Sequence, residues 1–235
     1  MDRLRGPGDG WLALLGGGEF SFGDTESADQ AWLARCGDGA IGFLPAASGS
    51  TEYGKHFGDY LRATFERDVE LLPIYRPRDA RRGRNLERIA QVAAVYLGGG
   101  VADQLLDALR DSPALEALHV QLARPGGLVV AIAAAAQAAG RRTRDLRGGS
   151  ILDGFGWLPT AVVEANFDVD HDRRLRRLLA EPGVTWGLGL AAGSAVLLGP
   201  DGALEVVGDV WRLDTPDGEL VPLASRHSHE PSPAD

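Results

Sequence analysis

The chain has 235 residues, of which 44% are hydrophobic and 24% are charged. This composition is typical of a globular protein, and the length is sufficient for one large hydrophobic core. The formal net charge of -9 at pH 7 argues against nucleic acid as a partner, because surfaces that bind phosphate backbones are basic.

Signals for export, membrane insertion and disulfide formation are weak. The single cysteine, Cys36, cannot form an intramolecular disulfide, and the first residues, MDRLRGPGDGW, lack the long apolar segment of a signal peptide. The longest apolar run, at 126–140, is too short and too rich in alanine to cross a bilayer. We therefore expect a cytoplasmic protein without a membrane segment.

In the first half of the chain, short apolar runs that end in glycine alternate with segments of helical period. This alternation is typical of βαβ units and a parallel sheet. Strands are expected at 11–20, 40–48, 69–75, 93–100 and 128–132. Helices are expected at 28–36, 50–67 and 85–93, and in two pieces split at Pro113 within 101–127.

After Gly149 the pattern changes to closely spaced strands joined by short turns. They are expected at 157–167, 184–190, 194–199, 203–209 and 210–214, whereas only the arginine-rich segment 170–181 predicts a helix. Residues 1–10 are expected to be a flexible N-terminus, and residues 225–235 a disordered tail. The pattern predicts one α/β domain over 11–224, with a mostly parallel sheet flanked by helices and an antiparallel extension from the second half.

Two of the predicted strands end in runs of glycine, GGGE at 16–19 and GGG at 98–100. Glycines after a parallel strand leave backbone N–H groups free to bind an oxyanion or a phosphate. Neither run has the GK[ST] of a P-loop or the GxGxxG of a dinucleotide site. Taken alone, each run is explained equally well as a simple turn.

The order of several segments resembles a serine peptidase family that includes dipeptidase E and cyanophycinase. The segments GGGE, FLPAAS, GGGVADQLL, AIAAAA, EANF and GLGLAAGSA follow one another within residues 11–213. In that family a GGGNTFQLL-like or GGDQ-like segment precedes a nucleophile elbow, GxSAGA. A PHF or DQHF segment brings the histidine, and a GIGIDExTA-like strand pair closes the site. The resemblance implies a flavodoxin-like three-layer sandwich and a homodimer.

The same comparison implies that the catalytic groups are substituted. Ala133 stands at the position of the nucleophilic serine, and Asn166 stands at the position of the histidine base. A methyl group cannot attack a carbonyl, and an amide has no useful proton affinity near pH 7. Ala191 and Ala192 replace the two carboxylates of the strand pair. The loss of all these groups together implies an inherited loss of hydrolytic activity.

The resemblance also implies which residues would still line a cleft. Gly99, Gly100 and the backbone N–H of Ala134 are the expected oxyanion-hole-like groups. The other cleft candidates are Gly17, Gly18, Glu19, Gln104, Glu164, Ala191 and Ala192. Such a cleft would hold a small peptide, an amino-acid-like ligand or a partner protein, and no cofactor is expected.

Other side chains are weaker candidates for chemistry. Ser48 and Ser50 follow a strand, in a stretch that the family carries as architecture. His171 lies among acidic residues of the type that bind hard metals, but a solvated turn explains the segment 168–172 better, so no metal is expected. Arg174 and Arg177 resemble arginines of a cyanophycinase helix, and a solvated helix face explains them equally well. One alternative stays open, namely a working hydrolase of peptides with acidic residues that uses a displaced serine.

Overall fold

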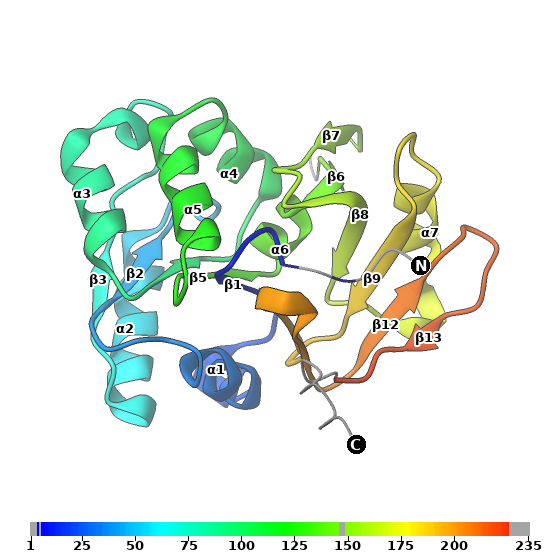
Figure 1. Cartoon of the computed structure of the whole chain (residues 1–235), viewed down its shortest axis with the longest axis horizontal. Helices are drawn as coiled ribbons and strands as arrows, with labels where there is room; N and C mark the ends of the chain where they lie inside the picture. The colour runs from blue at the N-terminus through cyan, green and yellow to red at the C-terminus, as the bar shows by residue number, and fades with distance from the viewer. Residues whose placement is uncertain (1–3, 5, 146–148, 226–235) are drawn as a thin grey trace, which may run out of the picture.

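The computed structural model of the protein describes residues 4, 6–145 and 149–225. A seven-stranded sheet, in the order β11-β10-β1-β5-β4-β2-β3, forms the left part of the molecule in Figure 1. Its parallel strands are β1 (Trp11–Leu15), β2 (Ile41–Leu44), β3 (Val69–Leu71), β4 (Ala94–Leu97) and β5 (Leu128–Ile132). The strands β10 (Ala195–Leu198) and β11 (Leu204–Val207) extend it in antiparallel fashion beside β1. This part of the fold agrees with the predicted α/β class.

The remaining strands form a second, six-stranded sheet in the order β13-β12-β9-β8-β6-β7. Its strands are β6 (Gly140–Arg144), β7 (Ile151–Asp153), β8 (Leu158–Ala165), β9 (Trp186–Leu190), β12 (Val210–Leu213) and β13 (Val221–Pro222). The sheet is mixed, because β6, β8 and β9 run parallel while β7, β12 and β13 pair in antiparallel fashion. The second half is therefore more than an antiparallel extension of the first sheet.

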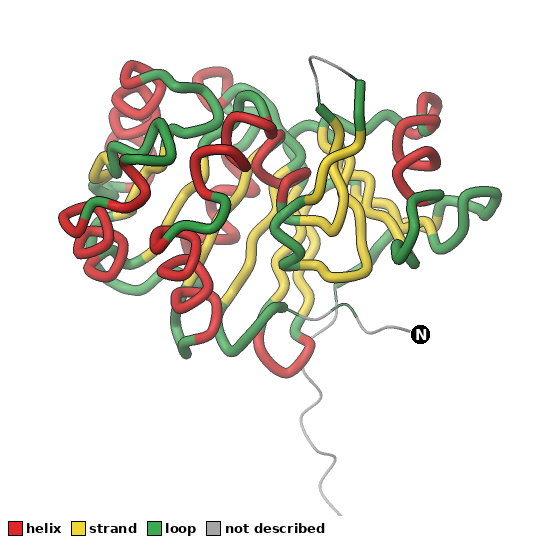
Figure 2. Tube along the Cα trace, turned by 90° about the horizontal axis from the view of Figure 1, so that it is seen from above, coloured by secondary structure: helices red, strands yellow, loops and turns green. Residues whose placement is uncertain are grey.

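Helices cover both sides of the first sheet, as Figure 2 shows from above. One side carries α1 (Glu26–Leu33) and α2 (Thr51–Phe65), and the other carries α3 (Gly83–Gln91), α4 (Ala102–Leu109) and α5 (Pro113–Ala123). The short helix α6 (Ala134–Ala138) contacts β5, β6 and β8, and α7 (Arg173–Leu179) packs on the second sheet. Short 3-10 turns at Phe20–Phe22, Asp79–Arg81, Val169–His171 and Pro200–Gly202 complete the described elements.

Two apolar layers follow from the alternation of side chains along the buried strands. Leu12 and Leu14 of β1 point into the layer under α3 to α5, whereas Ala13 and Leu15 point into the layer under α1 and α2. Because both faces are covered, β1, β2, β4 and β5 carry no charged residue at any position, whereas the edge strands β3 and β11 each contain a glutamate. This is why the sequence shows the former strands as continuous hydrophobic runs.

A fully buried carboxylate, Asp29, lies in the layer under α1. Its Oδ2 accepts hydrogen bonds from Thr25 Oγ1 at 2.7 Å and from the Tyr60 hydroxyl at 3.0 Å, and its Oδ1 accepts one from Trp32 Nε1 at 2.8 Å. Burial raises the pKa of Asp29, and these three hydrogen bonds oppose the increase. The Asp29 carboxylate therefore links Trp32 of α1 to Tyr60 of α2 by hydrogen bonds.

The ends of the chain only partly fall within the described residues. Leu4 is 1% exposed and packs into the first apolar layer. Ser225 Oγ accepts a hydrogen bond from the Val206 N–H at 2.9 Å, and the rest of the tail predicted to be disordered, 226–235, lies outside the described residues. The limits of the domain remain a prediction.

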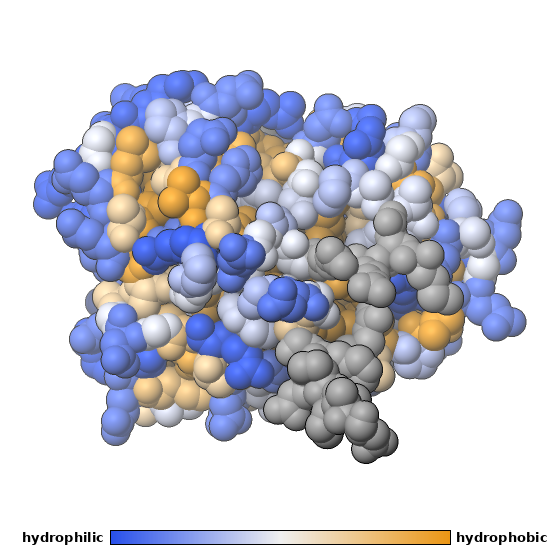
Figure 3. Space-filling model, viewed as in Figure 1, coloured by the Kyte–Doolittle hydropathy of each residue, from blue (hydrophilic) through white to orange (hydrophobic). Residues whose placement is uncertain are grey.

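The surface seen in Figure 3 is mostly hydrophilic, with hydrophobic groups gathered between α3 and α5. Val120, on α5, is 64% exposed. Homodimer formation stays a prediction. Among the described residues, no helix has the length and apolar character needed to cross a membrane.

Candidate functional site

Ala133 occupies a sharp turn between β5 and α6. Its φ of 52° and ψ of -113° form a conformation that residues with a side chain rarely adopt. Such strain costs about 1–3 kcal/mol and persists only where the surroundings impose it. The Ala133 N–H donates to the Leu15 carbonyl at 2.9 Å, and the Ala133 carbonyl accepts from the Gln137 N–H at 3.0 Å. The turn is thus fixed by β1 on one side and by the first turn of α6 on the other.

The glycine loop after β4 lies directly beside this turn. A Cβ placed on Gly99 would be 3.6 Å from the Ala133 Cβ. Gly100 has a φ of 146°, and a Cβ there would lie 2.3 Å from the Ala47 carbonyl oxygen. The loop therefore requires glycine at 100, both for its backbone conformation and for its close approach to 47. Gly99, Gly100 and Ala133 meet at the carboxyl ends of β4 and β5.

Tyr53 contributes a polar group to this place. Burial raises the pKa of Tyr53, and a hydrogen bond with the Gly99 backbone opposes the increase. A Cβ placed on Gly99 would be 3.7 Å from the Tyr53 hydroxyl oxygen, so this hydroxyl lies beside the glycine loop. The Tyr53 ring is fixed against Phe20 and Phe43, at centroid distances of 5.9 and 5.2 Å.

The loop after β1 brings Asn166 to the same edge. Asn166 follows β8, has a φ of 47°, and donates its N–H to the Gly16 carbonyl at 2.6 Å. Its side chain lies against Gly17, where a Cβ would be 2.4 Å from Asn166 Oδ1. Gly17 in turn accepts a hydrogen bond from the Gly193 N–H at 2.9 Å. The structure thereby brings together the glycine run 16–18, Asn166 and the turn that contains Ala191 and Ala192.

Two of the cleft candidates have other surroundings. Glu19 is exposed, and its Oε1 accepts hydrogen bonds from the Ser21 N–H and hydroxyl, at 3.3 and 2.9 Å. Gln104 is half-buried on α4, immediately after the glycine loop at 98–100. Glu19 therefore stabilises its own 3-10 turn.

A cavity of about 590 Å³ opens beside Asn166 at the ends of β8 and α7; we call it the Glu164 cavity. It is lined by Glu164, Asn166, Phe167, Asp168, Asp170, His171, Arg173 and Arg174. Glu164 is 3% exposed, and its Oε1 lies 3.5 Å from Arg144 Nη2 and 3.9 Å from Arg174 Nη1. Its Oε2 is buried and has no hydrogen-bond partner among the described residues.

The charge on Glu164 is set by opposing effects. Burial raises the pKa of Glu164, while Arg144 and Arg174 lower it. A smaller cavity of about 230 Å³ lies next to Arg144 and Arg174, and Arg177 also lines it. Arginine side chains therefore face both cavities, and acidic side chains also line both, so this region offers groups of both charges.

The remaining sequence candidates have structural roles. Ser50 Oγ accepts a hydrogen bond from the Tyr53 N–H at 3.3 Å and caps α2. Ser48 Oγ donates to the Pro45 carbonyl at 3.2 Å and accepts from the Ser50 N–H at 3.2 Å. His171 Nδ1 lies 2.7 Å from Asp168 Oδ2, a contact that lowers the pKa of Asp168, and the His171 side chain is 81% exposed. In the described part of the chain no three or more His, Cys, Asp or Glu side chains form a metal-binding group.

Sequence reasoning missed two residues of this region. Tyr53, in the helix expected at 50–67, was not among the site candidates, although its hydroxyl lies beside Gly99. Arg144 lies on β6, a strand that the pattern did not predict because arginine occupies three of its five positions. The remaining signal for Arg144 was the concentration of arginine in 141–147.

Comparisons with known proteins bear on the family and the fold. The profile of peptidase family S51 matches residues 12–204. A cyanophycinase from Synechococcus elongatus is 27% identical over 211 residues. The aligned region covers 83% of this chain and 64% of that relative. The crystal structure of a peptidase from an acI-B1 actinobacterium is similar in fold, with a TM-score of 0.71 at 19% identity over 96% of this chain and 98% of the other. A structure assigned to peptidase E from Listeria monocytogenes EGD-e gives a TM-score of 0.60 at 16% identity, over 87% and 99% of the two chains.

Proposed function

Because the chain belongs to peptidase family S51, we propose that it is a cyanophycinase- and peptidase E-like protein without hydrolytic activity that keeps a cleft for a small amino-acid-like or peptide ligand. The observation that carries this proposal is the elbow conformation of Ala133, whose side chain is only a methyl group. Covalent catalysis needs an ionisable oxygen or sulfur at such a turn. The backbone arrangement is present, but the nucleophilic atom is missing.

The second missing group is a base. Asn166 stands where the resemblance puts the histidine, and its side chain lies against Gly17. An amide does not accept a proton near pH 7, so it cannot activate a hydroxyl or a water molecule. Joint removal of nucleophile and base lowers the rate of a serine hydrolase by on the order of a million-fold. We therefore expect no measurable turnover of aspartyl dipeptides or of cyanophycin.

The Glu164 cavity supports binding of a small zwitterionic ligand. The unpartnered Oε2 of Glu164 is an acceptor for an ammonium group, and Arg174 offers a guanidinium for a carboxylate. Arg174 is 66% exposed, and its contact with Glu164 among the described residues is long, at 3.9 Å, so its guanidinium can turn toward a ligand. An amino acid or a short acidic peptide carries both complementary groups.

A serine-type exopeptidase with a displaced nucleophile is the second candidate. It is favoured by the position of the loop at 47–48, since a Cβ on Gly100 would lie 2.6 Å from the Ser48 N–H nitrogen. Ser48 is therefore a serine beside the glycine loop. Its hydroxyl, however, is engaged with the Pro45 carbonyl and the Ser50 N–H.

The activity test combines turnover with covalent labelling. The purified protein would be incubated with aspartyl dipeptides, with cyanophycin and with a serine-directed phosphonate, and labelled residues would be identified by mass spectrometry. We expect neither turnover nor a labelled serine. Labelling of one serine, together with turnover that Ser48→Ala abolishes, would establish the second candidate instead.

Binding would be measured separately by calorimetry with L-aspartate and an aspartyl dipeptide. Arg174→Gln should weaken binding about tenfold or more, because a charge-assisted hydrogen bond is lost. Arg62→Gln is a matched control, because Arg62 is 67% exposed and lies on α2, away from the cavity. Binding that both variants weaken equally, or that neither affects, would contradict the assignment of the cleft.

A further inference from the structure

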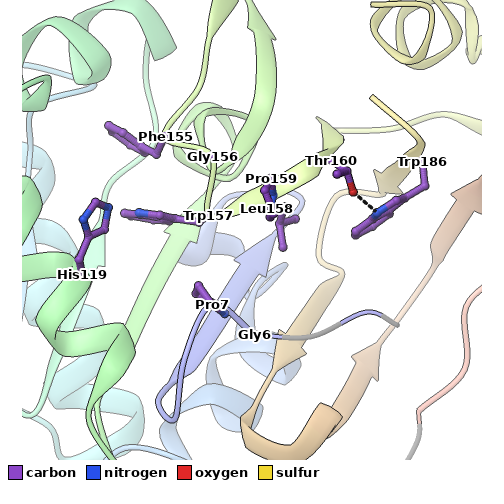
Figure 4. Close-up of a pocket in the computed structure, with 10 residues that line it drawn as sticks. All are labelled: Gly6, Pro7, His119, Phe155, Gly156, Trp157, Leu158, Pro159, Thr160 and Trp186. Carbon is purple, nitrogen blue, oxygen red and sulfur yellow. Dashed lines mark hydrogen bonds between the residues drawn. The ribbon is translucent and has the colours of Figure 1, made fainter. Parts of the chain in front are cut away.

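A second large cavity lies at the amino ends of β8 and β9. Asn166 and Ala191, in contrast, follow the carboxyl ends of these strands. It measures about 550 Å³ and is lined by Gly6, Pro7, His119, Phe155, Gly156, Trp157, Leu158, Pro159, Thr160 and Trp186. We call it the aromatic cavity (Figure 4). β8 contributes Thr160 to this cavity and Glu164 to the other, so at about 3.3 Å per residue their nearest lining residues on this strand are roughly 13 Å apart. The aromatic cavity is therefore independent of the Glu164 cavity.

The walls of the aromatic cavity are fixed before any ligand arrives. Phe155 stacks on Trp157 with ring centroids 4.9 Å apart, and the His119 ring meets Trp157 edge-on at 6.4 Å. On the other side, Trp186 Nε1 donates to Thr160 Oγ1 at 3.2 Å, as the dashed line in Figure 4 shows. The Arg212 guanidinium lies 5.2 Å from the Trp186 ring. Rigid aromatic walls reduce the entropy that a ligand loses on binding.

The lining carries almost no charge. None of its ten residues is Asp, Glu, Lys or Arg, although these types make up 24% of the chain. His119 is the one titratable side chain in the lining, and its Nδ1 lies 3.7 Å from Glu116 Oε2. Transfer of an uncompensated charge into such a lining is costly. The ligand that fits is neutral, in contrast to the zwitterion that suits the Glu164 cavity.

The polar atoms of the lining are mainly donors. Thr160 Oγ1 accepts from Trp186, which leaves the Thr160 O–H free to donate. Trp157 is 4% exposed, and its indole N–H has no hydrogen-bond partner among the described residues. The Trp157 nitrogen is itself buried, so the Thr160 hydroxyl is the donor that remains for a ligand in the cavity. Ring nitrogens and carbonyl oxygens of a planar heterocycle are acceptors for it.

We propose that the aromatic cavity is a binding site for a neutral, planar heteroaromatic compound. The flat ring would pack against the faces of Trp157 and Trp186, and its acceptor atoms would face the Thr160 hydroxyl. Stacking on aromatic rings gives affinity for the plane of the ligand, and the hydroxyl selects for acceptor atoms at its edge. This proposal does not depend on the loss of hydrolytic activity.

The test uses adenosine, uridine and nicotinamide as probes, with calorimetry and tryptophan fluorescence as readouts. At least one probe should bind and quench fluorescence. Thr160→Val keeps the shape of the side chain and should weaken binding about three- to tenfold, because one hydrogen bond is lost. Trp186→Leu should weaken it more. AMP should bind at least tenfold more weakly than adenosine, since no lining residue is a cation and the nearby Arg212 is paired with Asp214.

Trp211→Leu is the control variant, because Trp211 is half-buried on the neighbouring strand β12 and does not line the cavity. It should leave binding unchanged. Circular dichroism would verify the fold of each variant, and Thr160→Val keeps the test decisive if Trp186→Leu does not fold. Failure of all three probes to bind, or binding that Thr160→Val leaves unchanged and Arg174→Gln weakens, would overturn the proposal.

Discussion

Replacement of Ala133 by glycine should reveal the strain stored at the elbow. Ala133 has a φ of 52° and a ψ of -113°, in a region that glycine enters without steric cost. The substitution releases about 1–3 kcal/mol of backbone strain. Against this gain, glycine adds about 0.5–1 kcal/mol of backbone entropy to the unfolded chain, and a half-buried methyl group is lost. The net change expected for Ala133→Gly lies between about 0 and 2 kcal/mol of stabilisation.

Ala117→Gly is the matched control. Ala117 is half-buried like Ala133, but it lies within the regular helix α5. Glycine in a helix interior costs about 1 kcal/mol, so this variant should be destabilised. Because both variants lose one methyl group and gain the same unfolded-state entropy, the difference of about 1–3 kcal/mol between them measures the strain.

The free energy of unfolding would be measured by urea titration at pH 7 for the wild type and both variants. Equal m-values would show that the comparison concerns stability alone. If Ala133→Gly destabilises the protein as much as Ala117→Gly does, the elbow is not strained. The structural basis of the proposed function would then fail.

Three other measurements test different parts of the structure. Ala133→Ser with Asn166→His should give weak labelling by a serine-directed phosphonate, and a crystal structure with the new side chains more than about 5 Å apart would refute the placement of 166. Burial raises the pKa of Asp29, so the stability due to its proton is present at acid pH and is lost as the pH rises from 3.8 through the folded pKa. Asp29→Asn should flatten the pH dependence of the unfolding free energy in that window, and an unchanged slope would contradict this. Tyr53→Phe should accelerate hydrogen exchange of the Gly99 amide by about tenfold, and unchanged exchange would disprove their hydrogen bond.

The parallel part of the fold was predictable because its strands are buried on both faces. Such strands are continuous apolar runs, and the glycines after β1 and β4 mark their carboxyl ends. The predicted strand at 11–20 was too long, since Gly17 and Gly18, with φ of 120° and 112°, turn the chain away after Leu15. The short helix α6, at Ala134–Ala138, was not among the predicted helices, and β6 begins directly after it at Gly140.

The strand β6 could not be predicted from its own residues. Three of its five positions are arginine, which predicts an exposed segment. Arg142 is paired with Asp153 of β7, and Arg144 contacts Glu164 of β8. Asp153 and Glu164 both lie outside the sequence of β6 itself. The pairing of β6 with β7 and β8 brings each of them to its arginine. The aromatic cavity was missed for the same reason, since four segments that are distant in the sequence meet there.

The proposed loss of activity is compatible with an intact backbone at the elbow. The Ala133 N–H holds β5 to β1, and its carbonyl accepts the first hydrogen bond of α6, so the backbone here organises the centre of the fold. The Ala133 methyl group takes part in neither hydrogen bond. Replacement of serine by alanine would therefore remove the nucleophile without disturbing β1, β5 or α6, and the same holds for Asn166, whose N–H and not its side chain binds the Gly16 carbonyl. Under the proposed loss of activity, the backbone hydrogen bonds of this turn would be kept because they hold β1, β5 and α6 together, whereas the strain at 133 brings no benefit to stability.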